Sequence, residues 1–150
     1  MLLAACSIEG RVTPLAGGSG SAVPRAATWA LAVQGCEQAA QCEDIRSSLV
    51  GRLVGAGLAE RVVAAGQPAD VSLDVQVGRV RSVSGAERVF FGALAGRNEV
   101  TSTDTLRDRS GAVVRSFKVE SASAAHPFSG ESGLSDAYRQ FATDTVAALR

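Results

Sequence analysis

Apolar residues recur along this chain with two different periods, and each period predicts a type of secondary structure. Steps of three and four place apolar residues on one side of a helix that begins near Gln38 or Glu43 and ends at Ala56. Gly57 follows, and it is expected to end this helix in a left-handed cap with Leu58 packing back. A second helical stripe covers residues 134–149. Apolar and polar residues alternate most clearly over residues 71–77, as in a strand with one buried face. The pattern therefore predicts two amphipathic helices and a sheet for them to cover.

Shorter patterns add further strands to this sheet. The apolar positions change register after Gly78, which predicts a β-bulge there. The last two strands flank a turn at residues 108–111 and are expected to pair antiparallel. In chain order, the additional strand candidates are residues 29–33, 61–64, 98–106 and 112–121.

The order of elements predicts the fold class. One strand, one helix, a run of strands and a last helix indicate an α+β two-layer sandwich. We expect a mostly antiparallel sheet of four to five strands, with both helices packed on one face. A chain of 150 residues with 46% hydrophobic content can form one domain with a genuine core. This domain is assigned to residues 27–150.

The N-terminus resembles the end of a bacterial lipoprotein signal. In Leu3-Ala4-Ala5-Cys6, an apolar residue and two small ones stand directly before a cysteine. On this interpretation residues 1–5 are residual signal, and Cys6 is the lipid-modified first residue of the mature protein. Residues 6–26 contain Gly, Ser and Pro, and predict a flexible tether.

The signal lacks two of its usual parts. A basic region and a long apolar stretch are missing, so the alternative is an intracellular protein whose apolar start matches by chance. Ser7 follows the cysteine, where retention in the inner membrane would call for Asp. The resemblance to sorted lipoproteins therefore favours the periplasmic face of the outer membrane.

Two cysteines remain once Cys6 is assigned to lipid. Cys36 and Cys42 form an even pair, for which an oxidising periplasm favours a disulfide. Closing so short a loop would stabilise the fold by roughly 2 kcal/mol. A metal site or a redox pair is the alternative, although C-x-x-C spacing is absent and His126 is the only histidine. No metal is predicted.

Charge and motif content argue against several functions. Fifteen basic and fifteen acidic residues balance, so nucleic acid is not an expected partner. His126 lies in a loop with Pro127, and no G-x-S-x-G elbow is present to suggest a Ser-His-Asp site. Gly92 and Gly96 lack the Lys-Ser/Thr of a phosphate-binding loop. The chain is therefore predicted not to be an enzyme and to need no cofactor.

Residues 89–95 combine two phenylalanines with an apolar, glycine-containing stretch. One interpretation is a buried strand whose glycines allow a close backbone approach. The other is an exposed apolar segment that contacts a partner protein or the membrane. On the second interpretation, the contact residues are Phe90, Phe91, Leu94 and Arg97.

Arginines are frequent in the strand region. A solvated sheet face or edge explains them, because charged edges also prevent unwanted strand pairing. A binding face for an anionic glycan, a lipid head group or an acidic partner is the alternative. The set comprises Arg79, Arg81, Arg88, Arg97, Arg107, Arg109 and Arg115.

Several short motifs together resemble a known family. They are Asp44-Ile-Arg-x-x-Leu49, Ala56-Gly57-Leu58, Ala69-Asp70-Val71-x-Leu73-x-Val75, Gly92-x-x-x-Gly96-Arg97, Asp108-x-x-Gly111 and Phe141-Ala142. The pattern resembles a bacterial lipoprotein family of unknown function, DUF4410, and is more distantly similar to TolB N-terminal and CsgG-type α/β domains. The resemblance transfers no catalytic residues.

These interpretations converge on a lipid-anchored periplasmic domain of the bacterial cell envelope. We expect a non-enzymatic adaptor or assembly accessory, whose partners are the membrane, through the N-terminal lipid, and an envelope protein. The alternative is a solute- or glycan-binding lipoprotein with an arginine-lined pocket.

Overall fold

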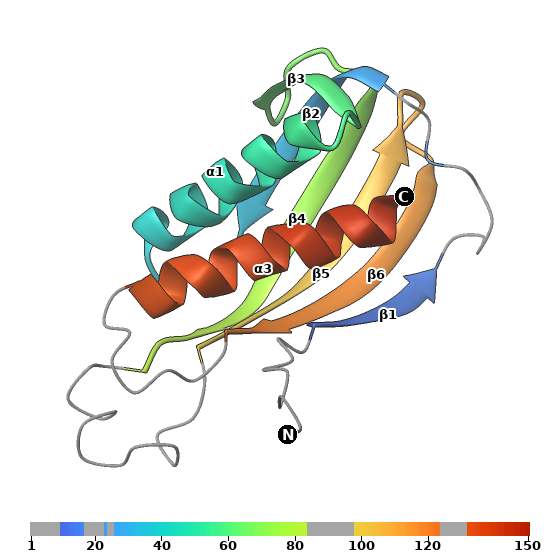
Figure 1. Ribbon diagram of the computed structural model, residues 1–150. Helices are drawn as coiled ribbons and strands as arrows, with labels where there is room; N and C mark the ends of the chain where they lie inside the picture. The colour runs from blue at the N-terminus through green and yellow to red at the C-terminus, as the bar shows by residue number, and fades with distance from the viewer. Residues whose placement is uncertain (1–9, 17–22, 24–25, 84–97, 124–131) are drawn as a thin grey trace, which may run out of the picture.

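The computed structural model describes residues 10–16, 23, 26–83, 98–123 and 132–150. Within these ranges, a six-stranded mixed sheet forms one layer and two helices form the other (Figure 1). The elements are β1 (Gly10–Ala16), β2 (Ala26–Gln34), α1 (Ala39–Gly55), β3 (Ala59–Ala64), β4 (Val71–Arg81), β5 (Glu99–Asp108), β6 (Val113–Ala122) and α3 (Ser132–Leu149).

The strands lie in the order β1-β6-β5-β4-β2-β3. β2 pairs in parallel with both β3 and β4, because α1 carries the chain back along the sheet between β2 and β3. β4, β5, β6 and β1 pair antiparallel. The α+β sandwich with two helices is confirmed, but the predicted sheet was too small, and three of its six strands are parallel. A register shift between Val77 and Arg79 confirms the bulge predicted at Gly78.

β1 is the strand that sequence patterning did not predict. It lies within residues 6–26, the segment expected to be a flexible tether, and it pairs with β6 from Gly10 to Ala16. Gly10 and Pro14 interrupt the alternation of apolar and polar residues by which a strand is usually recognised. Pro14 is tolerated because β1 is an edge strand, on which a missing N–H need not break a ladder.

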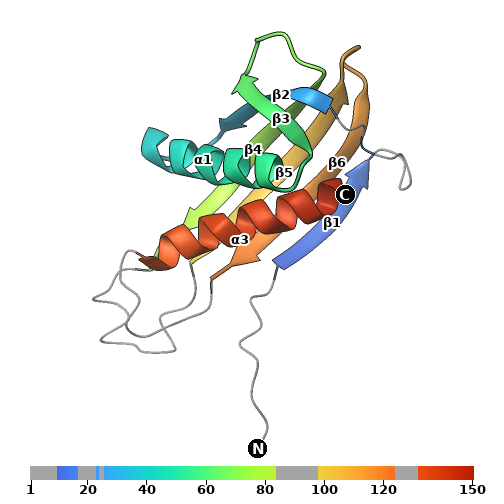
Figure 2. The same ribbon diagram turned by 45° about the horizontal axis from the view of Figure 1, so that its top comes forward.

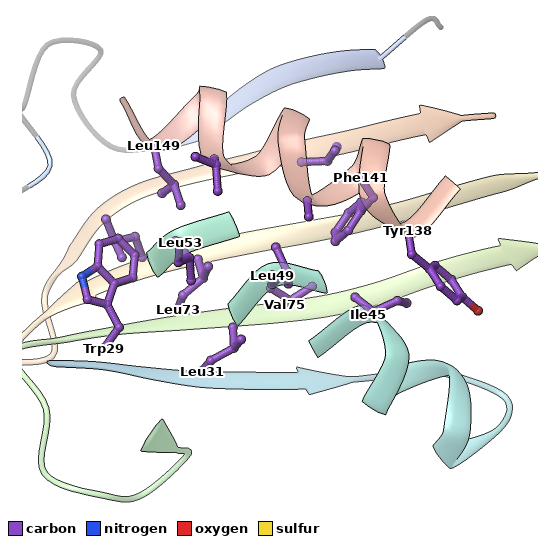
Figure 3. Close-up of a cluster of buried hydrophobic side chains, with 14 of the residues drawn as sticks. Trp29, Leu31, Ile45, Leu49, Leu53, Leu73, Val75, Tyr138, Phe141 and Leu149 are labelled. Carbon is purple, nitrogen blue, oxygen red and sulfur yellow. The ribbon is translucent and has the colours of Figure 1, made fainter. Parts of the chain in front are cut away.

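The hydrophobic core fills the space between the sheet and the helices, which lie on the same face (Figures 1 and 2). Trp29 of β2 is fully buried, and its Nε1 donates a hydrogen bond to the carbonyl oxygen of Leu58 at 2.9 Å. Leu49 of α1 and Phe141 of α3 point into the same cluster (Figure 3). Burying each such side chain contributes about 1.5–3 kcal/mol, so the two helical stripes are the main contacts that hold the layers together.

The end of α1 is set by a left-handed glycine. Gly57 has a φ of 73°, a conformation that costs little only without a Cβ. Its N–H donates to Val54, and the N–H of Leu58 donates to Leu53 at 3.1 Å. These two bonds form a Schellman motif, as the Ala56-Gly57-Leu58 pattern led us to expect.

The other face of the sheet is polar, and the structure places neither described helix on it (Figure 2). Asp74 and Arg107 form an ion pair across β4 and β5 at 3.6 Å. Lys118 and Glu120 form another along β6 at 3.1 Å. Hydroxyl and amide side chains occupy much of the rest of this face: Ser72, Gln76, Thr101, Thr103, Thr105 and Ser116.

Gly10 fixes how β1 meets α3. The Asp144 carboxylate of α3 accepts hydrogen bonds from Ser121 Oγ at 2.6 Å and from Gln140 Nε2 at 2.9 Å. A Cβ added at Gly10 would lie 2.0 Å from Asp144 Oδ2. A side chain at position 10 therefore has to displace this carboxylate or move the strand.

Replacing Gly10 by Ala is expected to lower the free energy of unfolding by about 1–3 kcal/mol, because Asp144 must leave Ser121. Urea denaturation followed by circular dichroism measures the change. Gly51→Ala on α1 is the matched control, since no atom lies within 4 Å of the new Cβ and the better helix propensity contributes roughly 0.5–1 kcal/mol. Equal effects of the two substitutions would contradict the packing of β1 against α3.

Candidate functional site

Several sequence-predicted site residues lie outside the described residues. They are Cys6, the proposed contact residues Phe90, Phe91, Leu94 and Arg97, and His126. The predictions about them stay predictions.

Cys36 and Cys42 are joined in a disulfide, with their Cα atoms 5.7 Å apart. Cys36 follows β2, and Cys42 lies in the first turn of α1, so the bridge closes the connection between these elements. Gly35 has a φ of 89°, and a Cβ there would lie 2.5 Å from the carbonyl oxygen of Val77. The connection therefore needs glycine on both grounds. No group of three or more His, Cys, Asp or Glu side chains suited to a metal occurs in the described part of the chain.

Three described arginines of the strand region have different partners. Arg107 lies on the polar face beside Asp74, and Arg109 pairs with Asp70 at the hairpin. Arg115 points to the opposite side of the sheet, where it donates to the carbonyl oxygen of Ala148 on α3. Arg88 and Arg97 lie outside the described residues. The arginine-lined pocket therefore stays a prediction.

Asn98 ties together three chain segments at one end of the sheet. Its Oδ1 accepts a hydrogen bond from the backbone N–H of Val83 at 2.8 Å, and its carbonyl oxygen accepts one from Ser123 at 2.9 Å. Asn98 is 1% exposed. These two hydrogen bonds hold together Val83 and Asn98, which flank the β4–β5 connection, and Ser123, at which the β6–α3 connection begins.

The start of β1 lies at this same end. Gly10 pairs with Ser121, Ser121 with Val100, and Val100 with Val80, so the four residues form one row across the sheet. The chain that comes from Cys6 therefore enters the fold beside the Asn98 contacts.

Asp104 is an ionisable group inside the core. It lies on β5 facing α3 and is fully buried. Its carboxyl group accepts hydrogen bonds from Ser102 Oγ at 2.6 Å and from Thr145 Oγ1 at 3.4 Å. Burial raises the pKa of Asp104 to about 7, against the opposing effect of these two hydroxyl groups. The neighbours directly across the sheet, Val75 and Phe117, are apolar.

A hollow of about 300 Å³ lies between the C-terminal halves of α1 and α3. Arg52 from α1 and Arg150 beyond α3 line it, together with Thr143 and small residues. Arg52 Nε donates a hydrogen bond to Thr143 Oγ1 at 3.2 Å. This hollow brings two cationic side chains together on the described surface.

Comparison with known proteins gives one family. A family described as "Domain of unknown function (DUF4410)" matches residues 30–127, more than half of the chain. The chain belongs to the DUF4410 family. This confirms the family resemblance of the sequence, while the more distant similarity to TolB and CsgG domains stays a prediction. A search of curated proteins found no match.

Two solved structures share the fold of this DUF4410 chain. One is a PelC dodecamer from Paraburkholderia phytofirmans, 21% identical, with a TM-score of 0.65, covering 94% of this chain and 97% of that chain. The other is a dodecamer of a leucine-to-methionine PelC variant from the same organism, with 22% identity and the same TM-score and coverage. No described helix of the DUF4410 chain is long and apolar enough to cross a membrane.

Asp104 was not predicted as a site residue, although the alternation along β5 carries a signal for it. Val100, Asp104 and Leu106 fall on one phase of the β5 alternation, so an inward-facing carboxyl group was implied once the register was known. Arg52 gave no comparable signal, because a lone exposed arginine on a helix is ordinary.

Replacing Asp104 by Asn is expected to flatten the pH dependence of stability. The raised pKa means that the folded state keeps its proton while the unfolded state loses it, so the free energy of unfolding of the native chain falls as pH rises from about 4 to about 7. Asn accepts and donates hydrogen bonds without charge. The stability of Asp104→Asn relative to the native chain should therefore increase by on the order of 2–4 kcal/mol between pH 4.5 and pH 8, measured by urea denaturation at both values. A stability difference that is the same at both pH values would contradict a buried, titrating carboxyl group.

Proposed function

We propose that this chain is a lipid-anchored periplasmic subunit of the bacterial cell envelope that works as a non-enzymatic adaptor or assembly accessory. The lipobox-like sequence ending at Cys6 supports the anchor. The disulfide between Cys36 and Cys42 suits an oxidising compartment.

The position of β1 carries the proposal. Gly10, four residues after Cys6, is paired in the sheet, and four extended residues span roughly 14 Å. A lipid on Cys6 would therefore hold the edge of the sheet directly at the membrane surface. The proposed membrane-facing end is the one that contains Gly10 and the Asn98 contacts. The outer membrane remains the favoured location, because Ser7 follows the cysteine.

Residues 84–97 connect two strands at this proposed membrane-facing end. Their stems, Val83 and Asn98, are fixed by the buried hydrogen bond between them. We therefore assign the contact with the membrane or an envelope partner to the apolar residues of the connection: Phe90, Phe91 and Leu94, with Arg97.

The partners in this proposal include further copies of the chain. Both solved structures that share almost the whole fold are described as dodecamers. An exposed β1 edge with Val12 38% and Leu15 53% exposed supplies apolar surface for such contacts. A subunit that assembles at a membrane needs no catalytic group, which fits the accessory function.

Substitution of Cys6 by Ala tests the anchor. The full chain with its native signal should fractionate with outer membranes, whereas Cys6→Ala should move to the soluble periplasmic fraction, because a domain without acyl chains lacks the membrane affinity that they supply. Cys42→Ser provides the control, since it removes a cysteine without touching the lipid. Unchanged membrane fractionation of Cys6→Ala would refute the anchored subunit.

Co-recovery of two tagged copies tests the assembly. In cells that produce the chain with two different tags, cross-linking at the membrane followed by capture of one tag should recover the other copy. Phe91→Asp should reduce recovery of the second copy or of other envelope proteins while leaving the thermal midpoint of the domain nearly unchanged. A collapse of the midpoint would instead assign Phe91 to the core, and failure to recover a second copy with the native chain would refute self-assembly.

A further inference from the structure

The hollow between α1 and α3 is open because small residues line it. Gly55, Ala56 and Ala147 occupy positions where larger side chains would close the space between the helices. A Cβ added at Gly55 would meet no atom within 4 Å. The bottom of the hollow is apolar, because Val146 is 4% exposed and belongs to the core.

The two arginines at this hollow have donors to spare. Arg52 is oriented by Thr143, whose hydroxyl group in turn donates to the carbonyl oxygen of Arg139 at 2.9 Å. Neither Arg52 nor Arg150 forms an ion pair with a described residue. By contrast, Arg107 and Arg109 are both paired with carboxylates. The hollow therefore has two cationic groups whose charge no described carboxylate neutralises through an ion pair.

Guanidinium groups recognise carboxylate and phosphate groups through paired hydrogen bonds. The last carbonyl groups of a helix, however, carry partial negative charge, although those of Leu53, Val54 and Ala148 each already accept one hydrogen bond. Both α1 and α3 end beside this hollow. An anion without hydroxyl groups would be repelled by these carbonyl groups, whereas a ligand with hydroxyl groups can donate hydrogen bonds to them.

We propose that the hollow binds a small hydroxylated anion, a sugar that carries a carboxylate or phosphate group, with Arg52 and Arg150 contacting the anionic group. Val146 and the neighbouring small residues would contact the apolar face of the sugar ring. The volume of about 300 Å³ suits a ligand of this size. This inference goes beyond the proposed adaptor function and depends on neither the lipid nor self-assembly.

Titration of the full chain with three sugars tests the ligand class. Glucuronate presents a carboxylate, glucose 6-phosphate presents a phosphate, and glucose is the neutral control. We expect saturable binding of at least one of the two anions in the millimolar range, with glucose about 10-fold weaker or more, measured by calorimetry and by amide chemical shifts of α1 and α3. The stronger of the two anions identifies the charged group. Equal binding of glucose, or no saturation by either anion, would overturn the proposal, as would binding of inorganic phosphate as tight as that of glucose 6-phosphate.

Variants of the hollow locate the binding. Arg52→Gln and Arg150→Gln should each weaken the tighter anion about 10-fold, because each removes charge-assisted hydrogen bonds. Arg46→Gln is the matched control on α1, since Arg46 does not line the hollow. Gly55→Phe should abolish binding by filling the space, and it tests the site without removing charge. Thermal melts report whether each variant is folded. Equal weakening by Arg46→Gln and Arg52→Gln would refute a specific site.

Discussion

The two helices lie along one face of the sheet, and the apolar contact between them and the strands determines the rest of the molecule. Leu49 of α1 and Phe141 of α3 are fully buried because the strands beneath them turn every second side chain upward. The same alternation turns the other side chains toward solvent, which is why the second face of the sheet carries threonines and ion pairs such as Asp74 with Arg107. The contact between the helices and the strands thus determines which side chains form the core and which form the polar face of the sheet.

Polar groups in this contact layer limit how far α3 can slide along the sheet. Asp104 of β5 faces α3 and accepts a hydrogen bond from Thr145 Oγ1 of that helix, whereas Asp144 belongs to α3 and accepts one from Ser121 Oγ of β6. A shift of α3 by one turn would break both of these hydrogen bonds, and an unsatisfied buried polar group costs about 1–3 kcal/mol or more. An apolar layer alone has no such preference for one register. Burying Asp104 costs free energy, but the hydrogen bond that its carboxyl group accepts from Thr145 also favours one position of α3 along the sheet.

Local features of the fold could be predicted from the sequence, whereas features made by distant residues could not. The cap at Gly57 and the bulge at Gly78 are consequences of a few adjacent residues, and the pattern indicated both. β1 depends on pairing with β6 more than one hundred residues away, and its own residues, with Gly10 and Pro14, do not suggest a strand. The parallel pairing of β2 with β4 and the hollow at Arg52 likewise depend on how complete elements pack. The spacing of apolar residues along the sequence shows which face of an element is buried, but not which other elements lie beside it.

The proposed membrane-facing end and the proposed ligand-binding hollow lie at opposite ends of the sheet. Gly10 and Asn98 lie at the end where α3 begins, and Arg52 and Arg150 lie at the end where both helices stop. β5 runs between these ends with 10 residues, a span of roughly 30 Å. If Cys6 holds the first end at the membrane, the hollow faces away from the lipid surface and toward the periplasmic space. A hydroxylated anion can then reach Arg52 without passing the membrane or the β1 edge, so anchoring and ligand binding do not compete for the same surface. The anchor therefore constrains how the domain is oriented at the membrane and does not constrain which ligand the hollow can bind.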